Sequence, residues 1–255
     1  MRLVAWAMVA SACALQPPPR PRAVLFDIDG TLFHSDPLHL RAFQRILAEE
    51  GYNGGVPIDE AFFMEMISGR QNKLICRDLF PEWDATRSER FSDRKEAMFR
   101  EMSAADGGLA PIAGLVDFMG EIDTCGVRKA AVTNAPRRNA ESMLDGIGRR
   151  DWFDALVIGD ECARAKPDPM PYLIAAKQLG VPIDECVVVE DSPSGASAGV
   201  AAGAFVVGIL SSQTPEALTA AGCGALIHDY NDLSALLALE PAATTAGNAI
   251  KPSSS

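Results

Sequence analysis

The chain has 255 residues, of which 48% are hydrophobic, and its formal net charge at pH 7 is −11. This length accommodates one large domain, or a core with a smaller inserted piece, and the composition predicts a substantial buried core. The negative charge and the lack of a long basic run argue against a nucleic-acid partner and against stable association with an anionic membrane surface.

Residues 1–22 have the composition of a targeting segment followed by a linker. An apolar stretch at residues 3–10 follows Arg2, and A-C-A at residues 12–14 matches a small-residue cleavage pattern. This is the build of a secretory signal, too short to span a membrane, and in some algae such a signal is the first half of a plastid address. The alternative is a disordered extension on a cytoplasmic protein. At the other end, residues 241–255 are rich in Ala, Thr and Ser, which predicts a disordered tail.

The first core segment ends in two aspartates. Residues 23–26 read A-V-L-F and run directly into Asp27, Asp29 and Gly30. Such a run predicts a buried strand whose carboxyl end opens into a turn. Side chains alternate along an extended chain, so Asp27 and Asp29 should lie on the same face. Two carboxylates held that close repel each other unless a proton or a cation lies between them.

Residues 36–102 show helical periodicity and no convincing strand. Residues 37–50 carry apolar side chains on one helix face, and Asp36 is the expected cap of that helix. Residues 58–66, 71–79 and 88–102 predict further helices. We interpret this region as a small all-helical insertion.

From residue 103 to residue 240, predicted strands alternate with predicted helices. The helices are expected at residues 114–125, 137–147, 171–179 and 195–202, and the strands at residues 128–134, 155–160, 186–191, 204–209 and 225–228. This alternation implies a parallel sheet covered on both faces. The predicted fold is therefore an α/β, Rossmann-like core formed by residues 23–35 and 103–240, with the helical insertion after its first strand.

Polar residues follow three of the predicted strands at their ends. These residues are Asp27, Thr133 and the adjacent pair Glu190 and Asp191. The carboxyl ends of parallel strands line one edge of a sheet, where ligands bind, so we expect these side chains to converge. Their carboxylate oxygens suit Mg²⁺ better than zinc. Lys166, in A-K-P-D-P, would supply a fixed positive charge there; the alternative is a solvated loop lysine.

Four segments, taken together, resemble the motifs of the haloacid dehalogenase-like hydrolases. They are D-I-D-G-T, V-T-N, A-K-P-D-P and V-V-V-E-D-S-P-S-G, in this order, and the resemblance covers roughly residues 22–240. The helical insertion at residues 36–102 resembles the C1 cap of that family. Three further segments, S-D-P-L-H-L-R-A-F, G-V-P-I-D-E and V-T-N-A-P, are similar to plant-type sugar phosphatases, close to the β-phosphoglucomutase group.

The resemblance implies a phosphoaspartyl mechanism. Asp27 would attack phosphorus as the nucleophile, and Asp29 would act as general acid and then as general base. Thr133 and Lys166 would hold the transferring phosphoryl group, to which Asn134 would offer a backbone N–H. The implied Mg²⁺ ligands are Asp27, Asp29 through its main-chain carbonyl, Asp191 and the nearby Glu190.

The resemblance also implies substrate-binding residues in the insertion. His39 matches a hinge-side histidine that links cap closure to proton transfer; the alternative is a helix residue that faces solvent. Gly69, Arg70 and Asn72 match the loop through which related caps meet the sugar. Lys95 matches a cap lysine near the substrate. For Arg70 and Lys95 the alternative is a solvated surface position.

The sequence thus favours a monomeric, Mg²⁺-dependent phosphatase that acts on small phosphorylated sugars. The first alternative is a β-phosphoglucomutase, and it is weakened because two cations that the mutase uses for a second phosphate align here with Asn72 and Pro136. The second alternative is a catalytically idle binding protein on the same fold. It is disfavoured because every motif residue is present.

Overall fold

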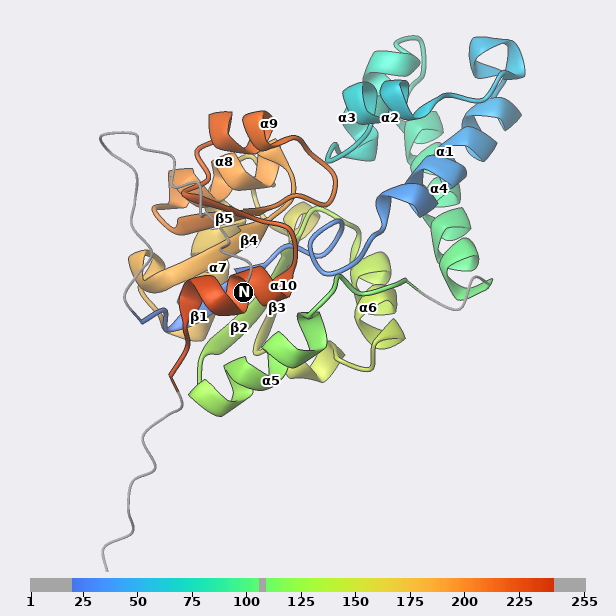
Figure 1. Cartoon of the computed structure of the whole chain (residues 1–255). Helices are drawn as coiled ribbons and strands as arrows, with labels where there is room; N and C mark the ends of the chain where they lie inside the picture. Colours follow the sequence, from blue (N-terminus) through green and yellow to red (C-terminus); the bar gives the residue numbers. More distant parts are fainter. Residues whose placement is uncertain (1–19, 106–108, 241–255) are drawn as a thin grey trace, which may run out of the picture.

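A computed structural model describes residues 20–105 and 109–240 (Figure 1), and across these residues six parallel strands form one sheet in the order β3-β2-β1-β4-β5-β6. The strands are β1 (Ala23–Phe26), β2 (Arg128–Thr133), β3 (Ala155–Ile158), β4 (Cys186–Glu190), β5 (Phe205–Ile209) and β6 (Ala225–Ile227). Every residue of the central strand β1 is buried, because all are apolar and both faces of the sheet are covered.

Helices cover the two faces of the sheet (Figure 1). One face packs against α5 (Leu115–Cys125), α6 (Arg137–Gly146) and α10 (Tyr230–Leu237). The opposite face packs against α7 (Met170–Leu179), α8 (Pro193–Ala202) and α9 (Pro215–Ala220). Side chains alternate along β1, so Phe26 belongs to the first hydrophobic cluster and Leu25 to the second. The predicted α/β parallel-sheet fold is confirmed.

A separate group of helices follows β1 and stands away from the sheet, at the upper right of Figure 1. It consists of α1 (Asp36–Glu49), α2 (Glu60–Met66), α3 (Asn72–Leu79) and α4 (Ala85–Ala105). These helices bury a hydrophobic cluster of their own, which includes Phe43, Phe63 and Phe91. We call this group the cap. The exact division into a cap at residues 36–102 and a core at residues 23–35 and 103–240 stays a prediction, which this separate cluster supports.

Short 3₁₀ turns complete the described elements, at Tyr52–Gly55, Arg150–Trp152, Gly159–Glu161 and Ile183–Glu185. Among the described helices, none is long and apolar enough to cross a bilayer. The targeting segment and linker expected at residues 1–22 lie almost entirely outside the described residues, as does the tail expected at residues 241–255.

The sequence patterns placed most helices correctly, with two differences. Ser35, and not Asp36, is the cap residue of α1; Asp36 is the first helical residue and accepts a hydrogen bond from Ser68 Oγ (3.1 Å). The expectation that Asp36 caps the helix is therefore wrong, because its carboxylate is bonded to Ser68. Ser68 lies in the loop between α2 and α3, which we call the cap loop (residues 67–71). Helices α9 and α10 are not among the expected elements, although Asp229 at the start of α10 accepts hydrogen bonds from Asn231 N and Asp232 N.

Candidate active site

The strand register brings the predicted polar residues to one edge of the sheet. Phe26, the last residue of β1, lies opposite Ala131 in β2 and Val189 in β4. The next residue, Asp27, therefore lies between the ends of both neighbouring strands, and its N–H donates to the Val189 carbonyl (3.1 Å). Because all strands are parallel, side chains that are far apart in the sequence meet at this edge.

Three carboxylates gather there. One oxygen of each of Asp27, Glu190 and Asp191 lies within 4.8 Å of the others, and all three residues are buried. Burial raises the pKa of Asp27 well above its ordinary value, and nearby Glu190 and Asp29 raise it further, against an opposing effect of Lys166. Burial likewise raises the pKa of Asp191, with contributions from Asp27 and Glu190. The cluster is thus an electrostatically costly set of hard oxygen donors, which a divalent cation would stabilise.

Gly30 lets Asp191 approach the end of β1. Its φ is +68°, and a Cβ atom there would lie 2.0 Å from Asp191 Oδ2. Any larger residue would therefore displace this carboxylate. The glycine of the D-I-D-G-T segment is required by a close approach as well as by a turn.

Lys166 joins the carboxylates from the loop before α7. Its Nζ donates to Asp27 Oδ1 (2.8 Å), to Glu190 Oε1 (2.6 Å) and to the Val132 carbonyl (2.7 Å). Burial disfavours the ammonium ion, but the charges of Asp27 and Glu190 outweigh burial and raise the pKa of Lys166. The lysine is 5% exposed, so the alternative of a solvated loop lysine is excluded.

Glu190 is held on all sides by hydrogen-bond donors. Oε1 accepts from Lys166 and from the Tyr172 hydroxyl (2.8 Å), while Oε2 accepts from Ser192 N (3.2 Å) and Ser192 Oγ (3.0 Å). At Gly195, a Cβ atom would lie 1.6 Å from Glu190 Oε1. This carboxylate is therefore fixed beside Lys166, and its oxygens have fewer free lone pairs than those of Asp191.

Thr133 and Asn134 follow β2 at the same edge. Thr133 is buried, and its Oγ1 accepts a hydrogen bond from Ala135 N (2.9 Å). The Asn134 side chain makes two hydrogen bonds with the main chain of Lys166. Asn134 Nδ2 donates to the Lys166 carbonyl (3.1 Å), and the Lys166 N–H donates to Asn134 Oδ1 (3.2 Å). The Asn134 side chain thus positions the lysine loop.

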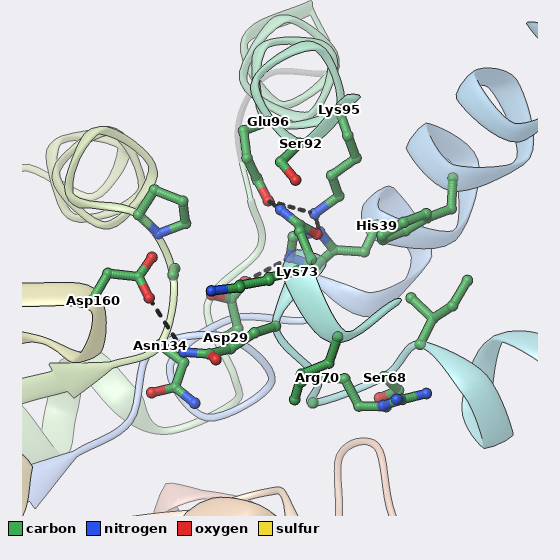
Figure 2. Close-up of a pocket in the computed structure, with 18 of the residues that line it drawn as sticks. Asp29, His39, Ser68, Arg70, Lys73, Ser92, Lys95, Glu96, Asn134 and Asp160 are labelled. Atoms are coloured by element: carbon green, nitrogen blue, oxygen red, sulfur yellow. Dashed lines mark hydrogen bonds and ion pairs between the residues drawn. The ribbon is translucent and has the colours of Figure 1, made fainter. Parts of the chain in front are cut away.

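The second aspartate of the first strand is bonded to the cap. His39 Nε2 lies 2.8 Å from Asp29 Oδ1, and Lys95 Nζ lies 3.0 Å from His39 Nδ1 (Figure 2). An ammonium ion has donors only, so Nδ1 accepts from Lys95 and the Nε2–H donates to Asp29. The imidazole also stacks on Phe99, with the ring centroids 4.1 Å apart. His39 therefore does not face solvent.

These contacts set the charge of Asp29. Burial alone would raise the pKa of this carboxyl group, but the hydrogen bond from His39 and the charge of Lys95 help to outweigh burial, and the pKa is lowered. Asp27 and Asp29 are two residues apart, and their pKa values move in opposite directions.

The remaining predicted cap residues differ in their burial and in the partners that they contact. Gly69 faces the core, since a Cβ atom there would lie 3.3 Å from Ser192 Cβ, and Asn72 Nδ2 donates to Glu96 Oε1 (2.5 Å). Arg70 instead donates to the Met66 carbonyl (2.7 Å) and to Asp78, both within the cap. Lys95 is 3% exposed, which excludes a solvated position. Arg70 is partly exposed and committed to cap partners.

A cavity of about 900 Å³ lies between the cap and the core edge. Asp27, Asp29 and Lys166 line its floor, and residues of α1, α3 and α4 line its other walls. Figure 2 shows His39, Lys95 and Glu96 on one side of this space, with Asn134 and Asp160 on the other. A cavity of this size accommodates a small metabolite.

Sequence reasoning missed several residues that line or support this cavity. They are Gln71, Glu96, Asn139 and Asp160. Asp160 follows β3 and accepts from Gln71 Nε2 (3.2 Å), so the rule that polar residues at strand ends converge could have identified it. Glu96 and Asn139 carried no such signal, because each lies within a helix whose orientation the sequence does not specify.

Known proteins are similar to this chain in sequence. Residues 21–203 match a family model described as haloacid dehalogenase-like hydrolase. A phosphoglycolate phosphatase of Rhodospirillum rubrum is 32% identical over 84% of this chain and 89% of its own length. A phosphorylated carbohydrates phosphatase of Thermotoga maritima is 29% identical over 84% of this chain and 97% of its own length.

A solved structure shares the whole architecture. CbbY from Rhodobacter sphaeroides, crystallised in complex with xylulose-(1,5)bisphosphate, superposes with a TM-score of 0.74 at 27% identity. The superposition covers 85% of this chain and 99% of the CbbY chain. The match therefore includes the cap as well as the sheet.

Proposed function

This chain belongs to the haloacid dehalogenase-like hydrolases, and from that membership we propose that it is a phosphatase that hydrolyses small sugar phosphates through an aspartyl-phosphate intermediate. The observation that carries the proposal is the juxtaposition of Asp27, Lys166 and Asp191 at the sheet edge, with Asp29 beside them and a cavity above. The names of the similar proteins, which are phosphatases of phosphoglycolate and of phosphorylated carbohydrates, support the same reaction class.

Asp27 is the proposed nucleophile. Its Oδ1 is held by Lys166, which leaves Oδ2 to attack phosphorus and displace the sugar oxygen. Thr133 would hold a phosphoryl oxygen, and the charge of Lys166 would offset the growing negative charge. In the second half of the reaction, water attacks the phosphorus atom, releasing inorganic phosphate and regenerating the Asp27 carboxylate.

Asp29 is the proposed acid and base. It would protonate the departing sugar oxygen and later remove a proton from the attacking water. The hydrogen bond from His39 keeps the Asp29 carboxylate oriented, and His39 with Lys95 forms a chain of donors that runs from the cap to this group. His39 therefore links the position of the cap to proton transfer.

We propose that Mg²⁺ is the cofactor, because the clustered donors are carboxylate oxygens and no soft ligand is among them. Asp27, Asp191 and the Asp29 carbonyl would hold the ion, while Glu190, whose oxygens already accept four hydrogen bonds, would mainly anchor Lys166. When bound, Mg²⁺ neutralises carboxylate charge and polarises the phosphoryl group toward attack.

The cap residues favour a leaving group without a second phosphate. Arg70 is bonded to Asp78, and Lys95 Nζ lies 3.0 Å from Glu96 Oε1, so a cap carboxylate offsets the charge of each cation. This pairing makes Arg70 and Lys95 poorer partners for the second phosphate of a bisphosphate, which a mutase would have to hold. The polar lining of the cavity near Gly69, Asn72 and Asn134 fits a leaving group that carries several hydroxyl groups better.

A screen of phosphate esters tests the proposal. The purified full-length protein is incubated with Mg²⁺ and a panel of sugar phosphates, phosphoglycolate and glucose 1-phosphate, and released phosphate is measured. We expect release from one or more sugar phosphates and its loss after chelation. Isomerisation of β-glucose 1-phosphate without net release, or equal activity after exhaustive chelation, would overturn the proposal.

A further inference from the structure

Glu96 is a buried carboxylate that the proposed chemistry does not use. It lies on α4, is 7% exposed, and accepts hydrogen bonds from three different elements. Oε1 accepts from Lys95 Nζ (3.0 Å; Figure 2) and from Asn72 Nδ2 at the start of α3 (2.5 Å), and Oε2 accepts from Asn139 Nδ2 on α6. Two of these donors belong to the cap and one belongs to the core.

The core donor is itself fixed in orientation. Asn139 is 1% exposed, and its Oδ1 accepts from Arg100 Nη1 (2.5 Å) one turn further along α4. If the Asn139 amide rotated by half a turn, its NH₂ group would face the Arg100 guanidinium, donor against donor. Arg100 therefore keeps the Asn139 NH₂ group directed at Glu96.

Glu96 is charged in this setting. Burial opposes ionisation, but the charge of Lys95 and the hydrogen bond from Asn72 help to outweigh burial, and the pKa of Glu96 is lowered. A carboxylate accepts about four hydrogen bonds, and three of those of Glu96 are formed with the protein. The contacts of Glu96 are with the protein, which makes it a positioning group.

We propose that Glu96 is a positioning residue that fastens the cap loop and the Lys95–His39 chain to core helix α6. The Asn72 contact sets the height of the cap loop over the cavity, and the Lys95 contact places the ammonium ion against His39 Nδ1 and thereby orients the partner of Asp29. The inference rests on the proposed function in one respect, the acid–base role of Asp29.

The test uses three isosteric variants: Glu96→Gln, Asn139→Asp and the double variant. In Glu96→Gln, the new NH₂ group faces either Asn139 Nδ2, which Arg100 prevents from turning, or Asn72 Nδ2 and Lys95 Nζ, so donors oppose each other in both orientations. In Asn139→Asp, two carboxylates face each other. In the double variant, Asp at position 139 accepts from both Arg100 and the new Gln NH₂ group, so the cap-to-core bond is restored. Glu101→Gln, at an exposed position on the same helix, is the matched control.

The kinetic arm compares two esters, glucose 6-phosphate and para-nitrophenyl phosphate. Departure of a sugar alkoxide requires protonation by Asp29, whereas nitrophenolate leaves with little help, so a positioning role predicts unequal losses. We expect Glu96→Gln to lower kcat/KM for glucose 6-phosphate by about ten- to a hundredfold, as for other buried charge-assisted bonds, and the double variant to recover at least about tenfold. The nitrophenyl ester should change by less than about threefold.

The structural arm does not depend on turnover. Hydrogen exchange of residues 67–73 is measured in the full-length variants with Mg²⁺ and inorganic phosphate, alongside thermal unfolding to show that each variant folds. We expect faster exchange in both single variants and wild-type protection in the double variant and in Glu101→Gln. Unchanged exchange in Glu96→Gln, or no recovery in the double variant, overturns the inference. If the wild-type protein released no phosphate from any ester, the proposed function would fail while the exchange data still decided the role of Glu96.

Discussion

The core and the cap use their cations in different ways. In the core, Lys166 is directed at Asp27 by strand register and by the Asn134 side chain, so its charge lies where phosphorus would react. In the cap, Arg70 and Lys95 are paired with the carboxylates of Asp78 and Glu96. All three cations are thus paired with carboxylates, but Lys166 lies beside the proposed nucleophile, whereas Arg70 and Lys95 are paired with carboxylates of the cap. A leaving group without a second anionic group suits this division.

The largest expected effect is at the nucleophile of the core. Asp27→Asn keeps the side-chain shape and an acceptor for Lys166 but cannot form the acyl phosphate, so we expect kcat to fall on the order of 10⁴-fold or more. Phosphate release from the best substrate of the screen measures this, and circular dichroism checks the fold. Asp151→Asn, at an exposed position, should behave as wild type. Substantial residual turnover in Asp27→Asn would contradict the aspartyl-phosphate mechanism.

Lys166→Met breaks the pairing that defines the core edge. It leaves Asp27 and Glu190 as buried carboxylates without their cation, so we expect the free energy of unfolding to fall by about 3–5 kcal/mol. Urea unfolding of the metal-free protein provides the measurement. Lys177→Met, exposed on α7, serves as the control and should change stability little. A loss in Lys166→Met no larger than in this control would mean that the pair contributes nothing to the fold.

Metal should stabilise the core edge in a pH-dependent way. The pKa values of Asp27 and Asp191 are raised in the folded state, so above the unfolded value of about 3.9 the folded chain binds more protons than the unfolded chain, and metal-free stability falls as pH rises. Mg²⁺ competes with those protons. We expect saturating Mg²⁺ at a hundredfold excess over Kd to add about 2.7 kcal/mol near neutral pH.

Thermal unfolding with and without Mg²⁺, at about pH 5 and about pH 7.5, tests this dependence. The stabilisation by Mg²⁺ should be smaller at the lower pH, and it should largely disappear in Asp191→Asn. Equal stabilisation at both pH values would place the ion away from these carboxylates.

The smallest effect is expected in the cap. Arg70→Met removes a partly exposed ion pair that lies within the cap, so kcat/KM should change by less than about threefold. Lys95→Met, the buried comparison, leaves Glu96 without its cation and His39 Nδ1 without its donor, and should lower kcat/KM by at least about tenfold. If Arg70→Met instead raised KM tenfold, Arg70 would leave Asp78 to bind substrate. A cap cation would then act on the ligand, as Lys166 does in the core.

The sequence by itself determined the sheet, the helical insertion and the residues at the strand ends. The hydrophobic runs and the glycines near Asp27 and Asp191 specify buried parallel strands, and parallel strands place Asp27, Thr133 and Glu190 at one edge whatever the loops between them do. These features are predictable because they depend on residues that are close in the sequence and on the regular register of neighbouring strands. Lys166 lies in a loop and not at a strand end, so only the tertiary structure decided its contact with Asp27.

Only the tertiary structure decided which cap side chains meet the core. Whether Arg70 binds Asp78, Asp36 binds Ser68 or Glu96 binds Asn139 depends on how helices of separate segments cross, and a helix offers several directions to each long side chain. Local periodicity identifies the buried face of a helix but not its partner. The pairing of Glu96 with Asn139, 43 residues away, is set by packing and so was invisible in the sequence.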